Sequence, residues 1–144
     1  MTQRLTATLH ELVFAMDAYA DRVLTRRFGV DRNLLAFLSP LAATTLDVTR
    51  LAEFLNLTKA AVSKRVPVLE RQGWVAVSSD PGHGRRVMVS LTPQGSTLVS
   101  EAGELLNRRF AALLDTETID ADRLNEQLHA LISAVRALPS EEDL

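Results

Sequence analysis

Residues 46–92 read LDVTRLAEFLNLTKAAVSKRVPVLERQGWVAVSSDPGHGRRVMVSLT, and this stretch decides the fold of the chain. Its apolar residues first recur at steps of three and four, the spacing of amphipathic helices, over 47–55 and again over 58–72. Apolar and polar residues then alternate over 74–78 and 87–91, which is the spacing of half-buried strands. The segment between these strands holds one proline and two glycines, which favours a turn.

Residues that cap helices stand at the start of both helical patterns. Asp47 and Thr58 each carry a side-chain oxygen that can accept a backbone N–H of the following turn. In the second pattern, Val62, Val66 and Leu69 recur at steps of four and three, which predicts the buried face of that helix. Two short helices followed by a β-hairpin predict a winged helix-turn-helix.

The sequence on either side of this stretch predicts only helices. Amphipathic patterns cover residues 5–28, 31–41, 92–114 and 124–138. We expect Pro40 to kink or shorten the second of these helices, because proline cannot donate a backbone hydrogen bond. The predicted fold class is therefore mainly α (α+β), with a winged helix-turn-helix between long terminal helices.

The pattern predicts a single domain over the whole chain. We expect a winged helix-turn-helix lobe at 30–95, dimerisation helices at 1–29 and 96–138, and a tail at 139–144. The terminal helices are long and apolar on one face, and the central module is too small to cover them. Such faces are usually buried against a partner, and a second copy of the chain is the partner we expect. An intramolecular bundle is the alternative.

Composition narrows the class of protein. The chain has 144 residues, of which 47% are hydrophobic and 24% charged, as is typical of a globular domain. It has no cysteine, so disulfides and thiolate metal sites are excluded, and no motif for a cofactor or a metal stands out. Charged residues interrupt the first apolar pattern, so we expect neither a signal peptide nor a membrane span, and a cytoplasmic protein.

Positive charge is concentrated in the central stretch. Residues 58–86 hold six basic and two acidic residues, a net charge of +4, while the whole chain carries −2 and its remainder therefore −6. A basic island on an acidic body suits localised contact with phosphates. A charged face that is merely solvated is the alternative.

Two segments carry a family resemblance. LAEFLNLTKAAVSKRVPVLERQGWV at 51–75 covers the helix-turn-helix and the first strand, and SDPGHGRRVMVSLTPQG at 79–95 covers the hairpin and the start of the next helix. With these motifs the chain resembles regulators of the MarR (multiple antibiotic resistance regulator) family over nearly its whole length. It departs from the family pattern at His83, where an acidic residue often stands two positions before the key arginine. Its first strand also lacks the usual basic end.

The resemblance implies a homodimer whose N- and C-terminal helices intertwine and which binds double-stranded DNA at a palindromic operator. It implies that the helix at 58–72 enters the major groove and that the hairpin tip reaches an adjacent minor groove or the backbone. In many relatives a small ligand binds between the dimer helices and the DNA-binding lobe. We therefore expect a transcription regulator, specifically a repressor relieved by a small-molecule effector.

The candidate DNA-contacting residues lie on the predicted recognition helix and at the hairpin tip. They are Thr58, Lys59, Ala60, Ser63, Lys64, Arg65, Arg71, Arg85 and Arg86. Ser63 and Lys64 lie opposite the core stripe, where their donors can reach base edges or phosphates. Thr58 and Lys59, at the helix start, suit backbone phosphates. The two tip arginines suit a narrow, electronegative minor groove.

Several residues of this helix have a second interpretation. Arg65 projects beside the core stripe and can equally form a salt bridge within the domain, and Arg71 can pair with an acid. Pro67 removes one backbone hydrogen bond, at a cost of about 3 kcal/mol in an ordinary helix. Either this helix bends around the DNA or tertiary packing holds it.

Tyr19 and Arg22 fall near the pocket expected between the lobes. Arg22 is the candidate to hold an anionic effector, and a place in the core is the alternative for Tyr19. No catalytic constellation stands out, so we do not expect an enzyme. A winged-helix protein-interaction module without specific DNA binding is the second hypothesis, which the low net charge and the missing basic strand end favour.

Overall fold

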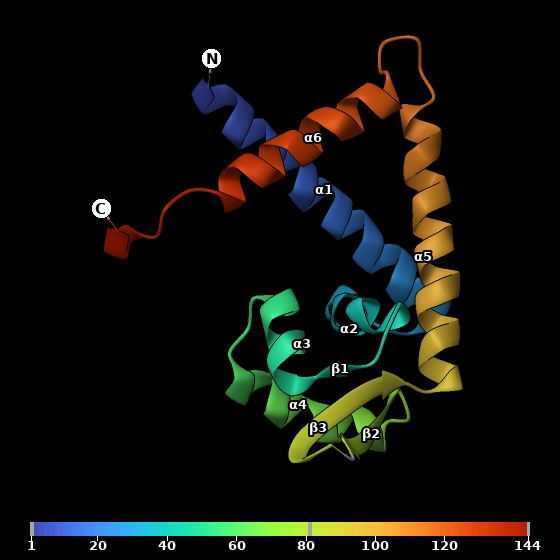
Figure 1. Cartoon of the computed structure of the whole chain (residues 1–144). Helices are drawn as coiled ribbons and strands as arrows, with labels where there is room; N and C mark the ends of the chain where they lie inside the picture. The colour runs from blue at the N-terminus through green and yellow to red at the C-terminus, as the bar shows by residue number, and fades with distance from the viewer. Residues whose placement is uncertain (1, 81, 144) are drawn as a thin grey trace. The chain divides into compact units, whose positions relative to one another are not determined.

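The computed structural model describes residues 2–80 and 82–143. The chain divides into two compact units, residues 1–105 and 106–144, and the boundary falls within helix α5 (Pro93–Leu114) (Figure 1). Helices make up most of both units, and a small antiparallel sheet lies in the first. The predicted fold class, a mainly α winged helix-turn-helix, is confirmed.

The first unit contains the winged lobe together with the first long helix. Its elements are α1 (Thr2–Phe28), α2 (Arg32–Leu38), η1 (Ser39–Ala42), β1 (Leu46–Asp47), α3 (Val48–Leu55), α4 (Lys59–Arg71), β2 (Val75–Asp80), β3 (His83–Leu91) and the first part of α5. The second unit contains the end of α5, α6 (Ala121–Arg136) and η2 (Glu141–Asp143). Among the described residues, no helix has both the length and the apolar character needed to cross a membrane.

Side-chain caps start the two helices of the helix-turn-helix, as predicted. The Asp47 carboxylate accepts a hydrogen bond from the backbone N–H of Arg50 at 2.7 Å, and the Thr58 hydroxyl accepts one from Ala61 at 3.1 Å. Each cap satisfies an amide that lacks an intrahelical partner. Between the helices, Asn56 has a φ of 52°, a left-handed conformation that ends α3 and turns the chain toward α4.

Two prolines affect their helices differently. The helix predicted over 31–41 is the short α2 followed by the 3₁₀ helix η1, so Pro40 shortens the α-helix as expected. By contrast, α4 continues through Pro67 to the end of its last turn. Val66 and Leu69, on either side of this proline, are buried, which favours tertiary packing as the reason that α4 tolerates it.

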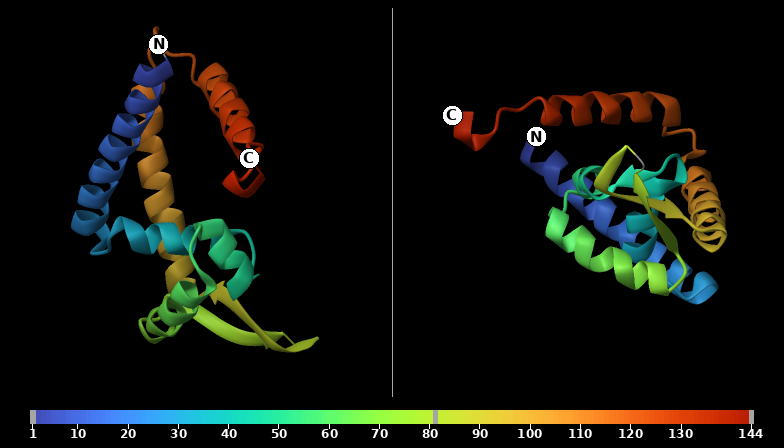
Figure 2. Two further views of the ribbon diagram at one scale, coloured as in Figure 1. Left: turned by 90° about the vertical axis from the view of Figure 1, so that its left-hand side faces the viewer. Right: turned by 60° about the horizontal axis from the view of Figure 1, so that its bottom comes forward.

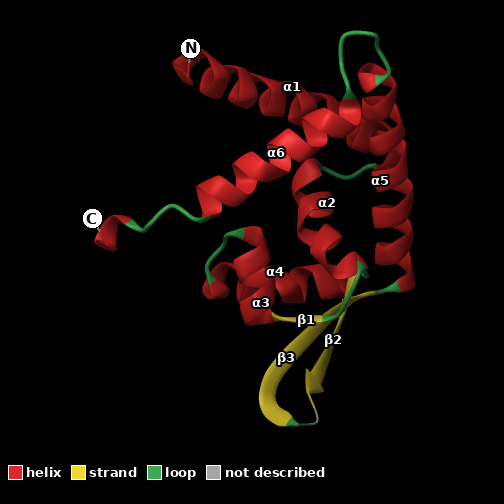
Figure 3. Ribbon diagram, turned by 45° about the horizontal axis from the view of Figure 1, so that its top comes forward, coloured by secondary structure: helices red, strands yellow, loops and turns green. Residues whose placement is uncertain are grey.

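The sheet has three antiparallel strands in the order β1-β3-β2 (Figure 3). The sequence does not predict β1, because this strand is only two residues long. It pairs Leu46 with Val89 and Asp47 with Met88, and α3 begins at the next residue. Strand β1 therefore ties the start of the helix-turn-helix to the hairpin.

The hairpin strands are longer than the sequence predicts. The prediction that a turn fills the whole segment between 78 and 87 is wrong: β2 continues to Asp80 and β3 begins at His83. These two residues pair after a register shift between Ser79 and Asp80. The Asp80 carboxylate accepts a hydrogen bond from the backbone N–H of Gly82 at 3.0 Å, which supports a tight turn. Cross-strand pairing thus extends into a segment whose glycines and proline indicated irregular structure.

The core of the first unit forms between its helices and its sheet. The predicted stripe of α4, formed by Val62, Val66 and Leu69, is buried. The largest fully buried side chains are Phe37, Leu24, Leu38, Leu51, Val62, Val75 and Val89. They come from α1, α2, α3, α4 and both long strands, so close packing fixes the position of α4 in the lobe.

The start of α5 lies directly against the chain segment that precedes β2. The Thr92 hydroxyl donates to the carbonyl of Gly73 at 2.6 Å and accepts the N–H of Gly95 at 3.0 Å. A Cβ at Gly95 would clash with the carbonyl oxygen of Trp74 and would lie 3.2 Å from its carbonyl carbon. The absence of a side chain at Gly95 therefore allows this close approach.

We predict that Gly95→Ala lowers the free energy of unfolding by about 3 kcal/mol, because the backbone atoms it meets cannot move aside easily. Gly103→Ala is the matched control in the same helix: no atom lies within 4 Å of its added Cβ, and alanine favours a helix over glycine by up to about 1 kcal/mol. Urea unfolding followed by circular dichroism measures both variants. Equal stability of Gly95→Ala and the wild type would contradict this account of the contact.

Candidate functional site

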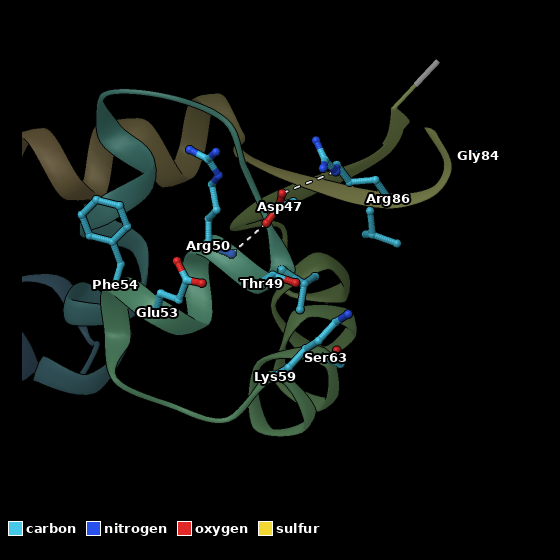
Figure 4. Close-up of a pocket in the computed structure, with 11 residues that line it drawn as sticks. Asp47, Thr49, Arg50, Glu53, Phe54, Lys59, Ser63, Gly84 and Arg86 are labelled. Atoms are coloured by element: carbon cyan, nitrogen blue, oxygen red, sulfur yellow. Dashed lines mark hydrogen bonds and ion pairs between the residues drawn. The ribbon is translucent and has the colours of Figure 1, made fainter. Parts of the chain in front are cut away.

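A cavity of about 770 Å³ opens between α3, the start of α4 and β3 (Figure 4). It is lined by Asp47, Val48, Thr49, Arg50, Glu53, Phe54, Lys59, Ser63, Gly84, Arg86 and Val87. Three of these residues are basic and two are acidic, so the walls are charged with a small excess of positive charge. All of them belong to the first unit and to the stretch 46–92.

The exposed face of α4 carries several of the predicted contact residues. Lys59, Ala60, Ser63 and Lys64 are all exposed, whereas the stripe on the other side of the helix is buried. Lys59 and Ser63 are four residues apart, so they lie on the same face of the helix, and both line the cavity (Figure 4). This face offers two ammonium groups and a hydroxyl to a ligand.

Thr58 has a structural role at the start of α4. Its hydroxyl oxygen accepts the N–H of Ala61 and so caps the helix. A hydroxyl has one proton to donate in addition to its acceptor lone pairs. Because the residue is exposed, capping leaves that proton available to an external acceptor such as a phosphate oxygen.

Arg65 and Arg71 have different surroundings. The guanidinium carbon of Arg65 lies 4.8 Å from the centre of the Phe37 ring, a cation–π arrangement that joins α4 to α2. The sequence analysis offered a DNA contact or a salt bridge for Arg65 and did not suggest this contact with an aromatic ring. Arg71 is exposed in the last turn of α4, and within the part of the chain that the structure describes it forms no ion pair.

Arg86 lies between two carboxylates. Its Nε is 3.5 Å from Oδ2 of Asp47, and its Nη1 is 3.8 Å from Oδ2 of Asp80. Asp47 comes from the start of the helix-turn-helix and Asp80 from the end of β2, so the guanidinium joins the helix-turn-helix to the hairpin. Figure 4 shows Arg86 directed toward Asp47 across one end of the cavity.

The side chains of His83 and Arg85 lie outside the described residues. Their backbones belong to β3, and Gly84 between them lines the cavity. The first part of β3 therefore borders the same cavity as Lys59 and Ser63. The role of Arg85 in DNA contact stays a prediction.

Sequence reasoning did not single out Arg50, Glu53 or Phe54. These residues are exposed on α3. Glu53 and Phe54 follow Arg50 by three and four residues, so all three lie on one face of the helix, which is polar except for Phe54. Phe54 is 71% exposed, which is unusual for an aromatic side chain. The polar face is visible in the sequence, but only the approach of β3 turns it into the wall of a cavity.

The two candidate effector residues lie elsewhere, one turn apart on α1. The guanidinium carbon of Arg22 is 5.9 Å from the centre of the Tyr19 ring; Tyr19 is partly buried and Arg22 is exposed. Neither lines the cavity, and their role toward an effector stays a prediction. Among the described residues, no group of three or more His, Cys, Asp or Glu side chains is arranged to hold a metal ion.

One family model matches the central part of the chain. Residues 24–86, which include α2, α3, α4 and most of the hairpin, match the model of the MarR family. The match confirms the resemblance that the sequence motifs indicate. No curated protein is a significant match to the chain.

Solved transcriptional regulators share the fold. A MarR/EmrR family regulator from Acinetobacter sp. ADP1 is 25% identical, with a TM-score of 0.76 over 95% of this chain and 98% of that chain. A MarR family regulator from Streptomyces coelicolor, solved in complex with DNA, is 20% identical, with a TM-score of 0.77 over 97% and 89%. The regulator BldR from Sulfolobus solfataricus is 23% identical, with a TM-score of 0.76 over 92% and 95%.

We predict that Arg65→Gln lowers the free energy of unfolding by about 1 kcal/mol, because the cation–π contact with the buried Phe37 ring is lost. Lys64→Gln is the matched control, since it removes the same charge from an exposed neighbour and should change stability by less than about 0.5 kcal/mol. Urea unfolding compares the two variants. Equal effects would contradict the structural role of Arg65.

Proposed function

We propose that this chain, which carries a MarR-family winged helix over residues 24–86, is a DNA-binding transcription regulator that contacts double-stranded DNA through α4 and the hairpin. The observation that carries the proposal is the exposed face of α4, where Lys59, Ser63 and Lys64 lie opposite a buried stripe. The fold shared with a Streptomyces coelicolor regulator solved on DNA supports the same class of partner. The solved relatives compared above are described as transcriptional regulators, which supports a regulatory rather than an enzymatic role.

An α-helix with a free polar face fits the major groove of DNA. Helix α4 is already held by the core along its other face, so it needs no ordering when it binds. Ser63 and Lys64, near the middle of the helix, would contact base edges and phosphates. Thr58 and Lys59 at its start would contact backbone phosphates, and Ala60 could approach a thymine methyl group.

The hairpin would make a second contact with the DNA. Figure 2 shows β2 and β3 extending beyond α3 and α4. Arg85 is near the start of β3, a position from which it would reach a minor groove or the adjacent backbone. Arg71, exposed in the last turn of α4, would contact a phosphate.

Two copies of the chain would bind one palindromic operator. The exposed large apolar residues of α1 are Leu5, Leu12, Val13, Phe14 and Met16, and those of α6 are Leu131, Ile132 and Val135. No residue of α6 is buried in the single chain. Apolar helix faces of this extent are normally covered by a partner, and a second copy would supply complementary faces from the same two helices.

We further propose that the regulator represses transcription and is released by a small molecule. The family resemblance supports this mode of regulation, and the cation–π pair on α1 offers a site of suitable chemistry. There, Arg22 would hold an anionic effector beside Tyr19. Such a regulator acts where the chromosome lies, so we propose a cytoplasmic location.

We predict that the purified protein binds duplex DNA from upstream of its own gene at least about 10³-fold more tightly than a scrambled duplex at about 0.15 M salt. Fluorescence anisotropy with labelled duplexes measures both affinities. Lys64→Ala should weaken upstream binding by roughly tenfold or more, because a donor on the groove face is lost. Arg26→Ala removes the same charge from the exposed last turn of α1, outside the groove face and outside the apolar residues proposed for the dimer interface; it is the control and should bind as the wild type does.

Equal affinity for the two duplexes would contradict sequence-specific regulation. Phosphate contacts release counterions, so they make DNA affinity depend on salt concentration. A weak association with DNA that does not change with salt would therefore support the interaction-module hypothesis, as would a stable complex with another protein.

We predict that the wild type sediments as a dimer and that Val13→Glu shifts it to the monomer mass, because a charge would be buried in the apolar interface. Ala15→Glu is the matched control: two residues apart on a helix point to nearly opposite sides, and both residues are exposed in the single chain. Analytical ultracentrifugation gives the masses, and circular dichroism checks that both variants are folded. A wild-type monomer at micromolar concentration, or equal dissociation of both variants, would contradict the proposed interface.

A further inference from the structure

Arg86 stands at the centre of an ion cluster that joins the hairpin to the helix-turn-helix. Its guanidinium lies 3.5 Å from Asp47 and 3.8 Å from Asp80. Each carboxylate also accepts a backbone N–H through its other oxygen: Asp47 from Arg50 at 2.7 Å, and Asp80 from Gly82 at 3.0 Å. One side chain therefore links the cap of α3 to the turn of the hairpin.

The three side chains of this ion cluster differ in their exposure to solvent. Asp47 is 13% exposed and Asp80 28%, whereas Arg86 is 47% exposed. Protein atoms therefore cover most of the Asp47 carboxylate and much of the Asp80 carboxylate, and Arg86 is the cation that lies beside both. Asp47 and Arg86 also line the cavity that Lys59 and Ser63 line. The negative charge of Asp47 thus lies at the surface on which phosphates would arrive, and that of Asp80 lies next to it, 3.8 Å from Arg86.

Strand pairing connects the start of the helix-turn-helix to the hairpin over only a short length. β1 forms two residue pairs with β3, Leu46 with Val89 and Asp47 with Met88. Arg86 precedes Met88 by two residues, so both lie on the same side of β3, and the ion pair extends the connection toward the hairpin tip. The orientation of the hairpin relative to α3 therefore depends on Arg86 as well as on β1.

We propose that Arg86 is a positioning residue for DNA binding, which neutralises Asp47 and Asp80 and fixes the hairpin on α3 rather than contacting a phosphate itself. This inference rests on the proposed function. Without Arg86, two unneutralised carboxylates would lie beside the phosphate path and repel the DNA backbone. The affinity lost on removing Arg86 then depends on the presence of these two carboxylates.

A double-mutant cycle tests this dependence. In the wild type, Arg86→Gln should weaken binding to the upstream duplex by about tenfold, because like charges are left facing the phosphates. In the Asp47→Asn/Asp80→Asn background, the same substitution should weaken binding by less than about twofold. Asparagine is chosen because it caps a helix as well as aspartate does, so the start of α3 is preserved.

Salt dependence separates positioning from direct contact. In the same Asn/Asn background, Arg86→Gln should leave the slope of log affinity against log salt unchanged. Lys59→Gln is the matched comparison and should reduce the slope by about 0.9, the value for one lost phosphate contact. Equal affinity losses for Arg86→Gln in both backgrounds, or a slope reduced as for Lys59→Gln, would overturn the proposal in favour of a direct phosphate contact.

Two further measurements keep the outcomes distinct. Arg86→Lys retains the neutralising charge and should keep most of the affinity for DNA. The midpoint of thermal unfolding should change little for any variant, because partly exposed ion pairs contribute little stability. Loss of affinity in Arg86→Lys equal to that in Arg86→Gln would count against neutralisation. If the wild type does not bind any duplex, the proposed function itself fails and this inference fails with it.

Discussion

The carboxylate of Asp47 connects three parts of the winged lobe. Its residue pairs with Met88 in the sheet, one of its oxygens caps α3 at Arg50, and the other faces Arg86. These interactions meet where the chain passes from β1 into α3. Because the cavity has α3 on one side and β3 on another, its width depends on this junction. An aspartate in this place therefore determines both where the helix begins and where the hairpin lies.

Helix α4 depends on a different constraint, the burial of one side. Its apolar stripe packs in the core, Thr58 caps its start, and Arg65 lies over the Phe37 ring. These contacts hold the helix although Pro67 interrupts its hydrogen bonding. A helix fixed in this way presents its polar face without further ordering, which reduces the entropic cost of binding a ligand.

The charge of the lobe is more localised than the composition suggests. The central stretch carries a net +4, yet Arg86 is engaged by two carboxylates and Arg65 by an aromatic ring. The cations that remain exposed on α4 are Lys59, Lys64 and Arg71. A surface with few available cations favours recognition through specific contacts over general attraction to phosphates.

The amino-acid sequence by itself determined the helices, their caps and the buried stripe of α4, because periodicity and capping act over a few neighbouring residues. It also indicated the family and the exposed face that carries Ser63 and Lys64. Only the tertiary structure decided the strand β1, the length of the hairpin and the partners of Arg65 and Arg86. Each of these depends on residues far apart in the chain: Leu46 meets Val89, Arg65 meets Phe37, and Arg86 meets Asp47. No local pattern contains such pairs, since they exist only after the core has packed.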